Sequence, residues 1–233
     1  MPIRAIVLSG DGINCEQETA QVCQSAGFEV DTVHVNDLLA QPTLINISRY
    51  KLLVVPGGFS FGDELGSGRL LALKLKFGLK GSIDQFTKDG GLVLGICNGF
   101  QVLTRLGLFG SNVALVENSA GRFINRWVGL EIVGDSVFTK GLSYLELPMR
   151  HGEGRLVKDK DFVRGVVPVF RYSEDVNGSF NQIAGLSSFE GRVLGLMPHP
   201  EAFWTKCLHP ESKDLPLGRV LFDNAFSYLK ERA

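Results

Sequence analysis

The sequence has few cysteines and prolines and no excess of either charge. Of its 233 residues, 4 are cysteine and 9 are proline, and 24 basic residues stand against 25 acidic ones, for a net charge of −1. Binding to nucleic acid or to an anionic membrane requires a basic excess that neutralises phosphates, so neither partner is expected. Cys15, Cys23, Cys97 and Cys207 are too scattered for a disulfide framework, which favours free thiols and a cytoplasmic location.

Long apolar runs are absent as well. No stretch approaches the roughly 18 apolar residues of a membrane span, and the short apolar run at residues 6–8 is not followed by the cleavage site of a signal peptide. With 44% hydrophobic and 21% charged residues, the composition is that of a folded globular protein. At this length we expect a single domain over residues 1–233.

The N-terminal half alternates short apolar segments that end at turns with amphipathic segments of helical spacing. The predicted strands cover residues 3–9, 28–35, 51–55 and 91–96, and the predicted helices cover about residues 16–26, 69–76 and 98–106. This alternation predicts a doubly wound, mostly parallel sheet with helices on both faces.

Beyond residue 110 the pattern changes to strands separated by turns. The strand-like segments are residues 113–116, 126–133, 162–171, 182–186 and 193–197, and a last amphipathic helix is predicted at about 217–230. We therefore expect an α/β fold whose parallel sheet continues into an antiparallel or mixed C-terminal extension.

Cys97 is the first candidate for catalysis. Ligands of open parallel sheets bind at the carboxyl ends of strands, and Cys97 lies between a predicted buried strand and a predicted helix. Gly95 and Gly99 flank it at two residues on either side, as in the strained turn of a nucleophile elbow, and the amides of the helix N-terminus favour a thiolate. Most free cysteines are buried hydrophobes, but this combination favours a nucleophile.

His199 and Glu201 are the candidate partners of that thiol. Of the four histidines, only His199 comes just after a predicted strand, and Pro198 and Pro200 fix its backbone. Glu201 is placed to accept a hydrogen bond from one ring nitrogen, so that the other exchanges a proton with the thiol and with the leaving amine. A His-Pro-Glu sequence alone is equally typical of an ordinary turn, and its place behind a strand favours catalysis.

Two amides are candidates for an oxyanion site. One belongs to Asn98, immediately after the nucleophile, and the other to Gly58, which ends the Pro-Gly-Gly loop behind the strand at residues 51–55. On local sequence, that loop is equally well explained as a tight turn. Local sequence therefore leaves open whether the Gly58 amide is the second donor.

Three rival motifs are weaker. Ser60 lies in a Gly-x-Ser-x-Gly sequence, but five residues beyond the predicted strand and ahead of glycines rather than a helix. His151-Gly-Glu153 is like the His-x-Glu of zinc deaminases, yet no Pro-Cys-x-x-Cys completes a metal site, and Cys207 and His209 have no second ligand pair. No metal is expected. The nucleotide-binding glycine motifs are also missing, so a reaction that needs ATP must take it from another chain.

The motifs together resemble those of class I glutamine amidotransferases. They are Gly95-Ile-Cys97-Asn-Gly99-Phe-Gln101 and Pro198-His199-Pro-Glu201. Six further stretches narrow the resemblance to the glutaminase subunits of phosphoribosylformylglycinamidine synthases, which act in purine biosynthesis. These stretches are residues 56–63, 122–128, 151–155, 171–172, 177–179 and 191–199.

The resemblance implies a class I amidotransferase fold and a triad of Cys97, His199 and Glu201 that releases ammonia from L-glutamine through a glutamyl thioester. It also implies that the ammonia passes to a separate ATP-dependent synthetase subunit. No cofactor is then expected in this chain, and ATP and Mg²⁺ are expected on the partner. Whether a third small subunit bridges the two is left open.

For the substrate, the resemblance implies that the Gly58 and Asn98 amides hold the oxyanion and that Gln101 contacts the amino-acid end of glutamine. One departure is Ala202, where the family often has arginine after His-Pro-Glu. Residues 202–217 are therefore left without a predicted role. The alternative hypothesis is a stand-alone γ-glutamyl hydrolase or cysteine peptidase with the same triad.

Overall fold

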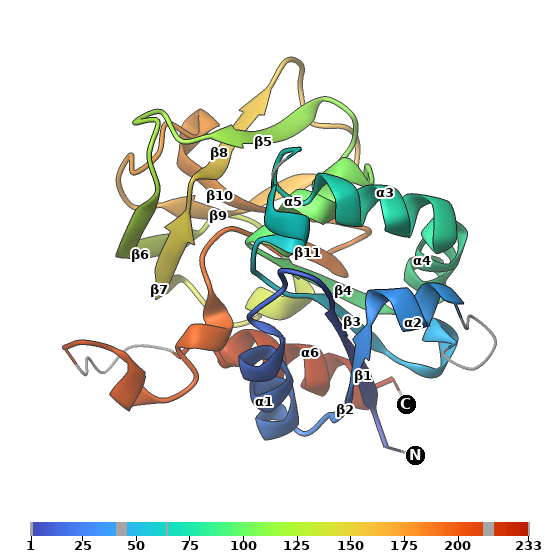
Figure 1. The fold of residues 1–233 in the computed structure, drawn as a ribbon. Helices are drawn as coiled ribbons and strands as arrows, with labels where there is room; N and C mark the ends of the chain where they lie inside the picture. Colours follow the sequence, from blue (N-terminus) through green and yellow to red (C-terminus); the bar gives the residue numbers. More distant parts are fainter. Residues whose placement is uncertain (1, 41–45, 64, 212–216, 233) are drawn as a thin grey trace.

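The computed structural model describes residues 2–40, 46–63, 65–211 and 217–232 (Figure 1). Its strands are β1 (Arg4–Ser9), β2 (Glu29–His34), β3 (Leu52–Val55), β4 (Leu92–Ile96), β5 (Val113–Glu117), β6 (Ile124–Ile132), β7 (Tyr144–His151), β8 (Glu153–Lys158), β9 (Val167–Tyr172), β10 (Ile183–Ser188) and β11 (Val193–Leu196). Its α-helices are α1 (Glu16–Ala26), α2 (Val35–Ala40), α3 (Arg69–Gly78), α4 (Lys80–Lys88), α5 (Asn98–Arg105) and α6 (Val220–Lys230).

Nine strands form one mixed sheet in the order β2-β1-β3-β4-β11-β10-β9-β6-β7. The first five strands in this order are parallel to one another, and the remaining pairs are antiparallel. A separate antiparallel pair, β5 and β8, lies at the top of Figure 1, where β5 packs against α5. The predicted α/β class, with a parallel N-terminal sheet and an antiparallel extension, is confirmed.

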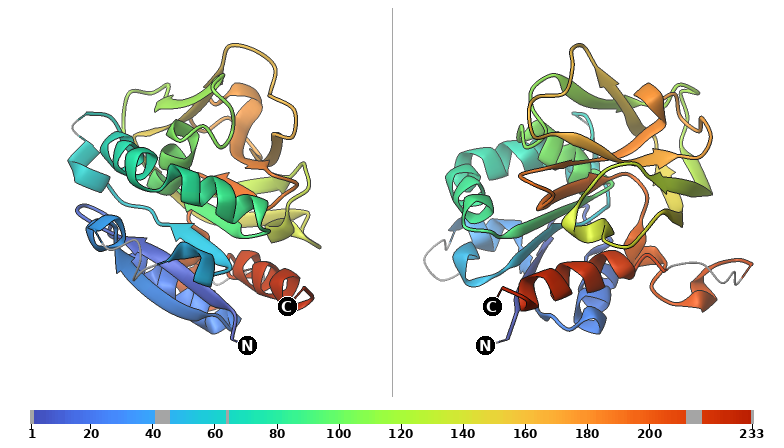
Figure 2. Two further views of the ribbon diagram at one scale, coloured as in Figure 1. Left: turned by 90° about the vertical axis from the view of Figure 1, so that its right-hand side faces the viewer. Right: turned by 180° about the vertical axis from the view of Figure 1, so that it is seen from behind.

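The helices cover both faces of the sheet. α3, α4 and α5 lie on one face, and α1 and α6 lie on the other (Figure 2). α1 ends at Gly27, whose φ of 112° only glycine adopts readily and whose missing side chain leaves room for the ring of Phe226 on α6. Phe226 also meets Phe28 edge to face, with ring centroids 5.1 Å apart, so the last helix closes against the first. No helix among the described residues is long and apolar enough to cross a membrane.

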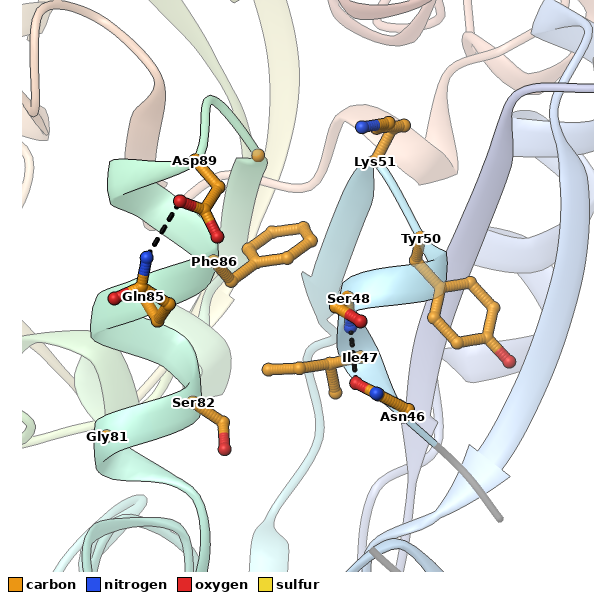
Figure 3. Close-up of a pocket in the computed structure, with 11 residues that line it drawn as sticks. Asn46, Ile47, Ser48, Tyr50, Lys51, Gly81, Ser82, Gln85, Phe86 and Asp89 are labelled. Atoms are coloured by element: carbon orange, nitrogen blue, oxygen red, sulfur yellow. Dashed lines mark hydrogen bonds between the residues drawn. The ribbon is translucent and has the colours of Figure 1, made fainter. Parts of the chain in front are cut away.

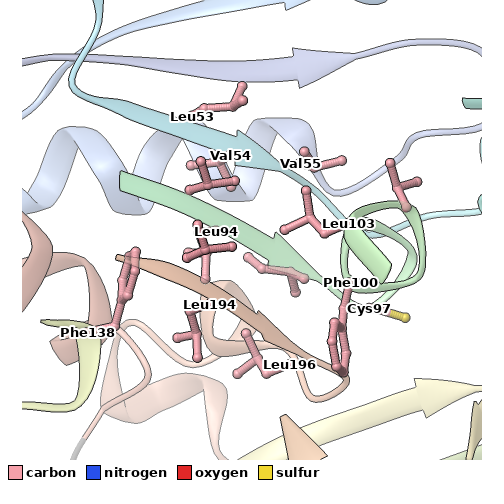
Figure 4. Close-up of a cluster of buried hydrophobic side chains, with 14 of the residues drawn as sticks. Leu53, Val54, Val55, Leu94, Cys97, Phe100, Leu103, Phe138, Leu194 and Leu196 are labelled. Carbon is pink, nitrogen blue, oxygen red and sulfur yellow. The ribbon is translucent and has the colours of Figure 1, made fainter. Parts of the chain in front are cut away.

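The central strands are fully apolar because both of their faces are covered. Every residue of β3, β4 and β11 is buried, and the sequence pattern there is a continuous apolar run rather than an alternation. This core sits directly beneath Cys97. Figure 4 shows the cluster, with the Cys97 sulfur beyond the packed side chains at the end of the strand that carries Leu94.

Some elements differ from the sequence prediction. Helix α4 was not predicted, because its surface positions are polar and only Ile83 and Phe86 are buried apolar residues. Strands β7 and β8 were missed too, β7 because Pro148 interrupts its alternating pattern. The strand predicted at 162–171 begins only at Val167, since a turn at residues 163–166 precedes it. The last helix begins at Val220, and residues 212–216, part of the segment without a predicted role, lie outside the described residues.

One edge of the sheet gathers segments from the whole chain. β1, β3, β4 and β11 are parallel and all end at this edge, and two successive antiparallel pairings give β9 the same direction as β11. β7 shares that direction through β6. The residues that follow these strands therefore meet, and they include every residue predicted to be catalytic.

Candidate active site

Cys97 occupies a strained turn between β4 and α5. Its backbone has φ of 50° and ψ of −106°, a region that residues other than glycine rarely adopt. Gly99 and Gly95 make the turn possible: a Cβ at Gly99 would lie 1.8 Å from the Val55 carbonyl oxygen, and one at Gly95 would lie 2.6 Å from Leu103 Cδ1. The backbone thus holds Cys97 in the strand-to-helix geometry of a nucleophile elbow.

The Cys97 thiol lies just beneath the protein surface. The residue is 5% exposed, and its Sγ donates a hydrogen bond to the Arg150 carbonyl oxygen at 3.7 Å. Arg150 belongs to β7, an element that the sequence did not predict. The antiparallel extension therefore supplies part of the wall around the sulfur.

His199 and Glu201 form a buried pair next to that thiol. His199 follows β11, and its backbone N–H donates to the Pro148 carbonyl oxygen at 2.9 Å. Its Nδ1 lies 2.6 Å from Glu201 Oε1, while His199 Nε2 and Glu201 Oε2 have no hydrogen-bond partner within the described part of the chain. The hydrogen bond at Nδ1 orients the ring. The buried Nε2, which has no partner, is therefore available to a reacting group.

The surroundings of His199 favour its protonated form. Burial alone disfavours a charged imidazole, but the Glu201 carboxylate and the neighbouring sulfurs of Cys97 and Cys15 outweigh it, so that the pKa of His199 is raised well above its ordinary value. The structure thus brings Cys97, His199 and Glu201 together from segments about 100 residues apart in the sequence.

A second thiol, Cys15, shares the imidazole. Cys15 precedes α1 and is partly exposed, and its interaction with His199 opposes the burial that raises its pKa. Gly57 makes room for both side chains, since a Cβ there would lie 2.8 Å from His199 Cε1 and 3.4 Å from Cys15 Sγ. No sequence pattern indicated Cys15 as part of the site, although it lies in the loop that follows β1 at the same edge of the sheet.

The two predicted oxyanion donors come from the loop after β3 and from the start of α5. Gly58 has φ of 143°, and a Cβ there would lie 2.6 Å from the Gly12 carbonyl oxygen, so the loop is more than an ordinary turn. Phe59 N–H donates to that same Gly12 oxygen at 2.7 Å, which ties the loop to the turn after β1. Asn98 is the first residue of α5, where backbone amides have no partner within the helix.

Gln101 lies in the same region, but other protein groups hold its side chain. Its Oε1 accepts from Asn98 Nδ2 at 2.9 Å, and its Nε2 donates to the Glu153 carbonyl oxygen. Glu153 Oε2 in turn accepts from Ser67 N–H at 3.3 Å. Gln101 therefore connects α5 to β8, and its contact with glutamine stays a prediction.

The rival motifs fall differently in the structure. Ser60 is buried, its N–H donates to Asn98 Oδ1 at 3.3 Å, and the next α-helix begins only at Arg69, so no strand-to-helix elbow forms there. His209 is buried against Trp127, with ring centroids 4.3 Å apart, whereas Cys207 is exposed. Neither belongs to a cluster of metal-ligating side chains within the described residues.

His151 is a further buried group near the triad. It is 3% exposed, and neither ring nitrogen has a hydrogen-bond partner in the described ranges. Burial, together with the charge of His199, lowers the pKa of His151 to about 3. Its ring lies over Gly154, where a Cβ would come within 2.2 Å of it. The residue is therefore neutral at physiological pH.

The opposite edge of the sheet carries a cavity of about 320 Å³ (Figure 3). It lies where β3 and β4 begin, between the 3₁₀ turn Ile47–Arg49 and α4, and Ser48, Gln85 and Phe86 are among the side chains that line it. None of the residues predicted to be catalytic lines it. Its size alone does not connect it with the chemistry of the carboxyl edge.

Comparison with known proteins identifies this arrangement. Residues 2–229 match the model of the CobB/CobQ-like glutamine amidotransferase domain. The chain is 34% identical to the phosphoribosylformylglycinamidine synthase subunit PurQ of Dehalococcoides mccartyi over 98% of both chains. It is 40% identical to the PurQ subunit of Methanococcus maripaludis over 89% of this chain and 85% of the relative.

Solved structures agree with these relatives. A chain in the structure of PurLQS from Thermotoga maritima superposes with a TM-score of 0.81 at 37% identity, covering 98% of this chain and 100% of that one. A glutamine amidotransferase from the same organism, only 19% identical, gives a TM-score of 0.59 over 99% of this chain and 93% of that one, and shows the fold alone.

Proposed function

Because the chain belongs to the CobB/CobQ-like glutamine amidotransferase family and, within it, to the PurQ subunits of phosphoribosylformylglycinamidine synthase, we propose that Cys97, His199 and Glu201 carry its glutaminase chemistry. The chain is the glutaminase subunit of that enzyme of purine biosynthesis. The observation that carries the catalytic assignment is a buried imidazole held by Glu201 at 2.6 Å beside a thiol on a strained elbow.

In the first half of the reaction, the Cys97 thiol gives its proton to His199 Nε2, and Sγ attacks the carbon of the glutamine side-chain amide. The Gly58 and Asn98 amides stabilise the negative charge that develops on the amide oxygen. The C–N bond then breaks, and His199, whose raised pKa favours the imidazolium, gives its proton to the leaving nitrogen. Ammonia leaves and a glutamyl thioester remains on Cys97.

In the second half, water attacks the thioester carbon and His199 takes the proton of the water. The C–S bond breaks, and glutamate leaves with the thiolate restored. Glu201 holds the ring in one orientation and stabilises its charge throughout, because its Oε1 accepts from Nδ1. No redox step or cofactor is involved in either half.

The ammonia passes, in our proposal, to an ATP-dependent synthetase subunit that holds ATP and Mg²⁺, and a third small subunit completes the complex. The similar chain from Thermotoga maritima was solved as part of PurLQS, and this supports such an assembly. We expect the subunit to be slow alone, since Cys97 is only 5% exposed and movements of surrounding groups commonly gate access to a buried reacting atom.

Two exposed aromatic rings mark the face that we assign to the synthetase. Phe59 and Phe123 are 47% and 51% exposed, and their ring centroids lie 6.3 Å apart. Phe59 follows the proposed oxyanion residue Gly58, so the pair borders the glutamine site. Large exposed apolar side chains beside a site that must deliver a reactive product are typical of a protein interface.

Two remaining features complete the proposal. All four cysteines are free thiols, which supports a reducing, cytoplasmic location. The match of the family model to residues 2–229 supports one amidotransferase domain over residues 1–233.

The decisive experiment measures glutamate release by the purified chain with and without synthetase, nucleotide substrate and ATP. We expect slow hydrolysis alone and strong acceleration in the complex. Cys97→Ala should abolish glutamine-dependent synthesis, by at least about 1,000-fold, while the complex still uses added ammonia. Full activity without a partner would support the independent hydrolase instead, and loss of the ammonia-dependent reaction would assign Cys97 to assembly.

A matched pair of variants tests the assigned face. Phe123→Ala should weaken binding of the synthetase by about tenfold or more, whereas Phe77→Ala, at an 86% exposed ring on α3, should not change it. Equal affinities for the two variants would place the synthetase elsewhere.

A further inference from the structure

Three side chains of the active site converge as ligands, and one of them is not needed for the triad. One ligand atom each of Cys15, His199 and Glu201 lies within 4.8 Å of the other two. The triad chemistry uses His199 and Glu201 with Cys97, so it gives no reason for a second thiol at this place. Cys15 brings a soft sulfur ligand to a buried imidazole and a buried carboxylate.

The buried carboxylate of this cluster has unused bonding capacity. Glu201 is 2% exposed, yet its Oε2 has no hydrogen-bond partner in the described structure. Buried polar atoms without a partner are rare in folded proteins, and a bound ion is one way in which such atoms are satisfied. Cys15 itself is partly exposed, so solvent reaches the cluster from its side.

We propose that Cys15, His199 and Glu201 form a binding site for a thiophilic divalent cation of the Zn²⁺ class, which holds the glutaminase in an inactive state. Sulfur, imidazole nitrogen and carboxylate oxygen are the three donor types of tetrahedral zinc sites. Three protein ligands leave a fourth position for water, which is the arrangement of an accessible zinc site.

The geometry needs only small adjustments. Ligands of a tetrahedral zinc ion lie about 3.3–3.6 Å apart, given Zn–N and Zn–O distances of about 2.0 Å and a Zn–S distance of about 2.3 Å. In the structure His199 Nδ1, the nitrogen on the side of Glu201, lies 2.6 Å from Glu201 Oε1, and one ligand atom of each of the three residues lies within 4.8 Å of the other two. Side-chain movements of less than about 1.5 Å bring the atoms into range.

Binding is a proton exchange rather than a redox step. The Cys15 thiol loses its proton to solvent as its sulfur binds the cation, and the imidazolium of His199 loses one proton when its nitrogen becomes a ligand. The cation then bonds to His199 Nδ1, so the one proton left on the ring stays on Nε2, and Nε2 can no longer accept a proton in the reaction. The cation also holds Glu201 in place. Glutamine hydrolysis stops until a chelator removes the ion.

A titration on a variant without the nucleophile tests this site. Reduced Cys97→Ala protein should bind one equivalent of Zn²⁺ by calorimetry, and Cd²⁺ should give the near-ultraviolet absorbance of a thiolate ligand. Adding Cys15→Ala should weaken both by at least about 100-fold. The matched control, Cys97→Ala with Cys207→Ala, removes an exposed thiol and should bind as the parent does.

Two results would overturn the site. Loss of binding in Cys97→Ala alone would mean that the ion binds to the catalytic thiol, and unchanged binding after the addition of Cys15→Ala would exclude the second thiol as a ligand. Cys15→Ser replaces Cys15→Ala if the apo alanine variant unfolds at a lower temperature than its parent. Because none of these measurements uses glutamine hydrolysis, a negative outcome leaves the proposed glutaminase chemistry standing.

In the unmodified complex, the same site predicts that micromolar Zn²⁺ lowers glutamate release and that a chelator restores it. Ammonia-dependent synthesis should continue in the presence of the ion, since that reaction does not use this chain's thiols. Inhibition of both reactions to the same extent would place the inhibitory ion on the synthetase.

Discussion

The two ends of the central sheet differ in how fully their polar groups are paired. At the amino end, polar side chains around the 320 Å³ cavity have hydrogen-bond partners: Gln85 Nε2 donates to Asp89 Oδ1 at 2.7 Å, and Tyr50 Oη donates to Asp31 Oδ2 at 2.7 Å. At the carboxyl end, bonds join distant segments, such as the one between Cys97 and Arg150. That end also buries His199 Nε2, which has no hydrogen-bond partner in the described residues.

A cavity and a reactive site are therefore separate properties of this fold. The amino end has a cavity of about 320 Å³, and polar side chains that line it, such as Tyr50 and Gln85, have hydrogen-bond partners. The carboxyl end has strained backbone at Cys97 and unsatisfied polar atoms, which are kept only where the surrounding fold holds them in place. The following predictions compare the two ends.

The largest effect is expected for His199→Ala at the carboxyl end. Glutamate release by the complex should fall by at least about 1,000-fold, because both proton transfers lose their carrier. The loss of glutamate release in Glu201→Gln should be about 100-fold smaller than in His199→Ala, since the variant weakens the orientation of the ring but leaves the proton acceptor in place. Steady-state kcat at saturating glutamine measures both, and equal losses would show that the carboxylate does more than orient.

Alanine substitutions at one glycine of each end should change stability in opposite directions. Gly99→Ala would place a Cβ 1.8 Å from the Val55 oxygen, so the free energy of unfolding should fall by about 3 kcal/mol. Gly81→Ala in α4 meets nothing within 4 Å and should raise it by about 0.5–1 kcal/mol through helix propensity. Urea unfolding checks both, and an equally tolerated Gly99→Ala would contradict the tight elbow.

Acid should weaken the carboxyl end first. The pKa of His151 is about 3 in the folded chain against an ordinary value of 6.5, so the unfolded chain binds more protons between these values and stability falls as the pH drops below 6.5. The slope is at most about 1.4 kcal/mol per pH unit. His199, with its raised pKa, acts in the opposite direction: its contribution is complete below pH 6.5 and is lost as the pH rises through the raised value.

The pH dependence of the free energy of unfolding, measured from about pH 4 to pH 7, checks this expectation. His151→Gln should remove the contribution of His151 and flatten the curve below pH 6.5. A variant with the same slope as the parent protein would show that other groups dominate the acid response.

The smallest effect is expected at the amino end. Gln85→Ala removes a side chain from the lining of the cavity and a single local hydrogen bond to Asp89. Activity should be unchanged, and the free energy of unfolding should shift by no more than about 0.5 kcal/mol. A tenfold loss of glutaminase activity would connect this cavity with the reaction after all.

Local pattern was sufficient for part of the fold and of the site. The apolar run of β4, the glycines around Cys97 and the helix behind it are adjacent in the sequence, so the elbow was predicted from a short segment. Strand β7 was not, because Pro148 interrupts its pattern, and with it the contact of Arg150 with the thiol was missed. Cys15 was not predicted, because His199, with which it interacts, lies far away in the sequence.

Local sequence was enough to predict the α/β class, the strained turn at Cys97 and the residue types of the proposed triad, since each depends on neighbours within a few positions. Three features became visible in the folded chain alone: Cys15 shares the imidazole of His199, Gln101 is held by Glu153, and the 320 Å³ cavity lies at the amino end of the sheet. They depend on the register of a nine-stranded sheet, which, with its crossovers, sets which strand ends meet. That register depends on packing across the whole core rather than on any local run of residues.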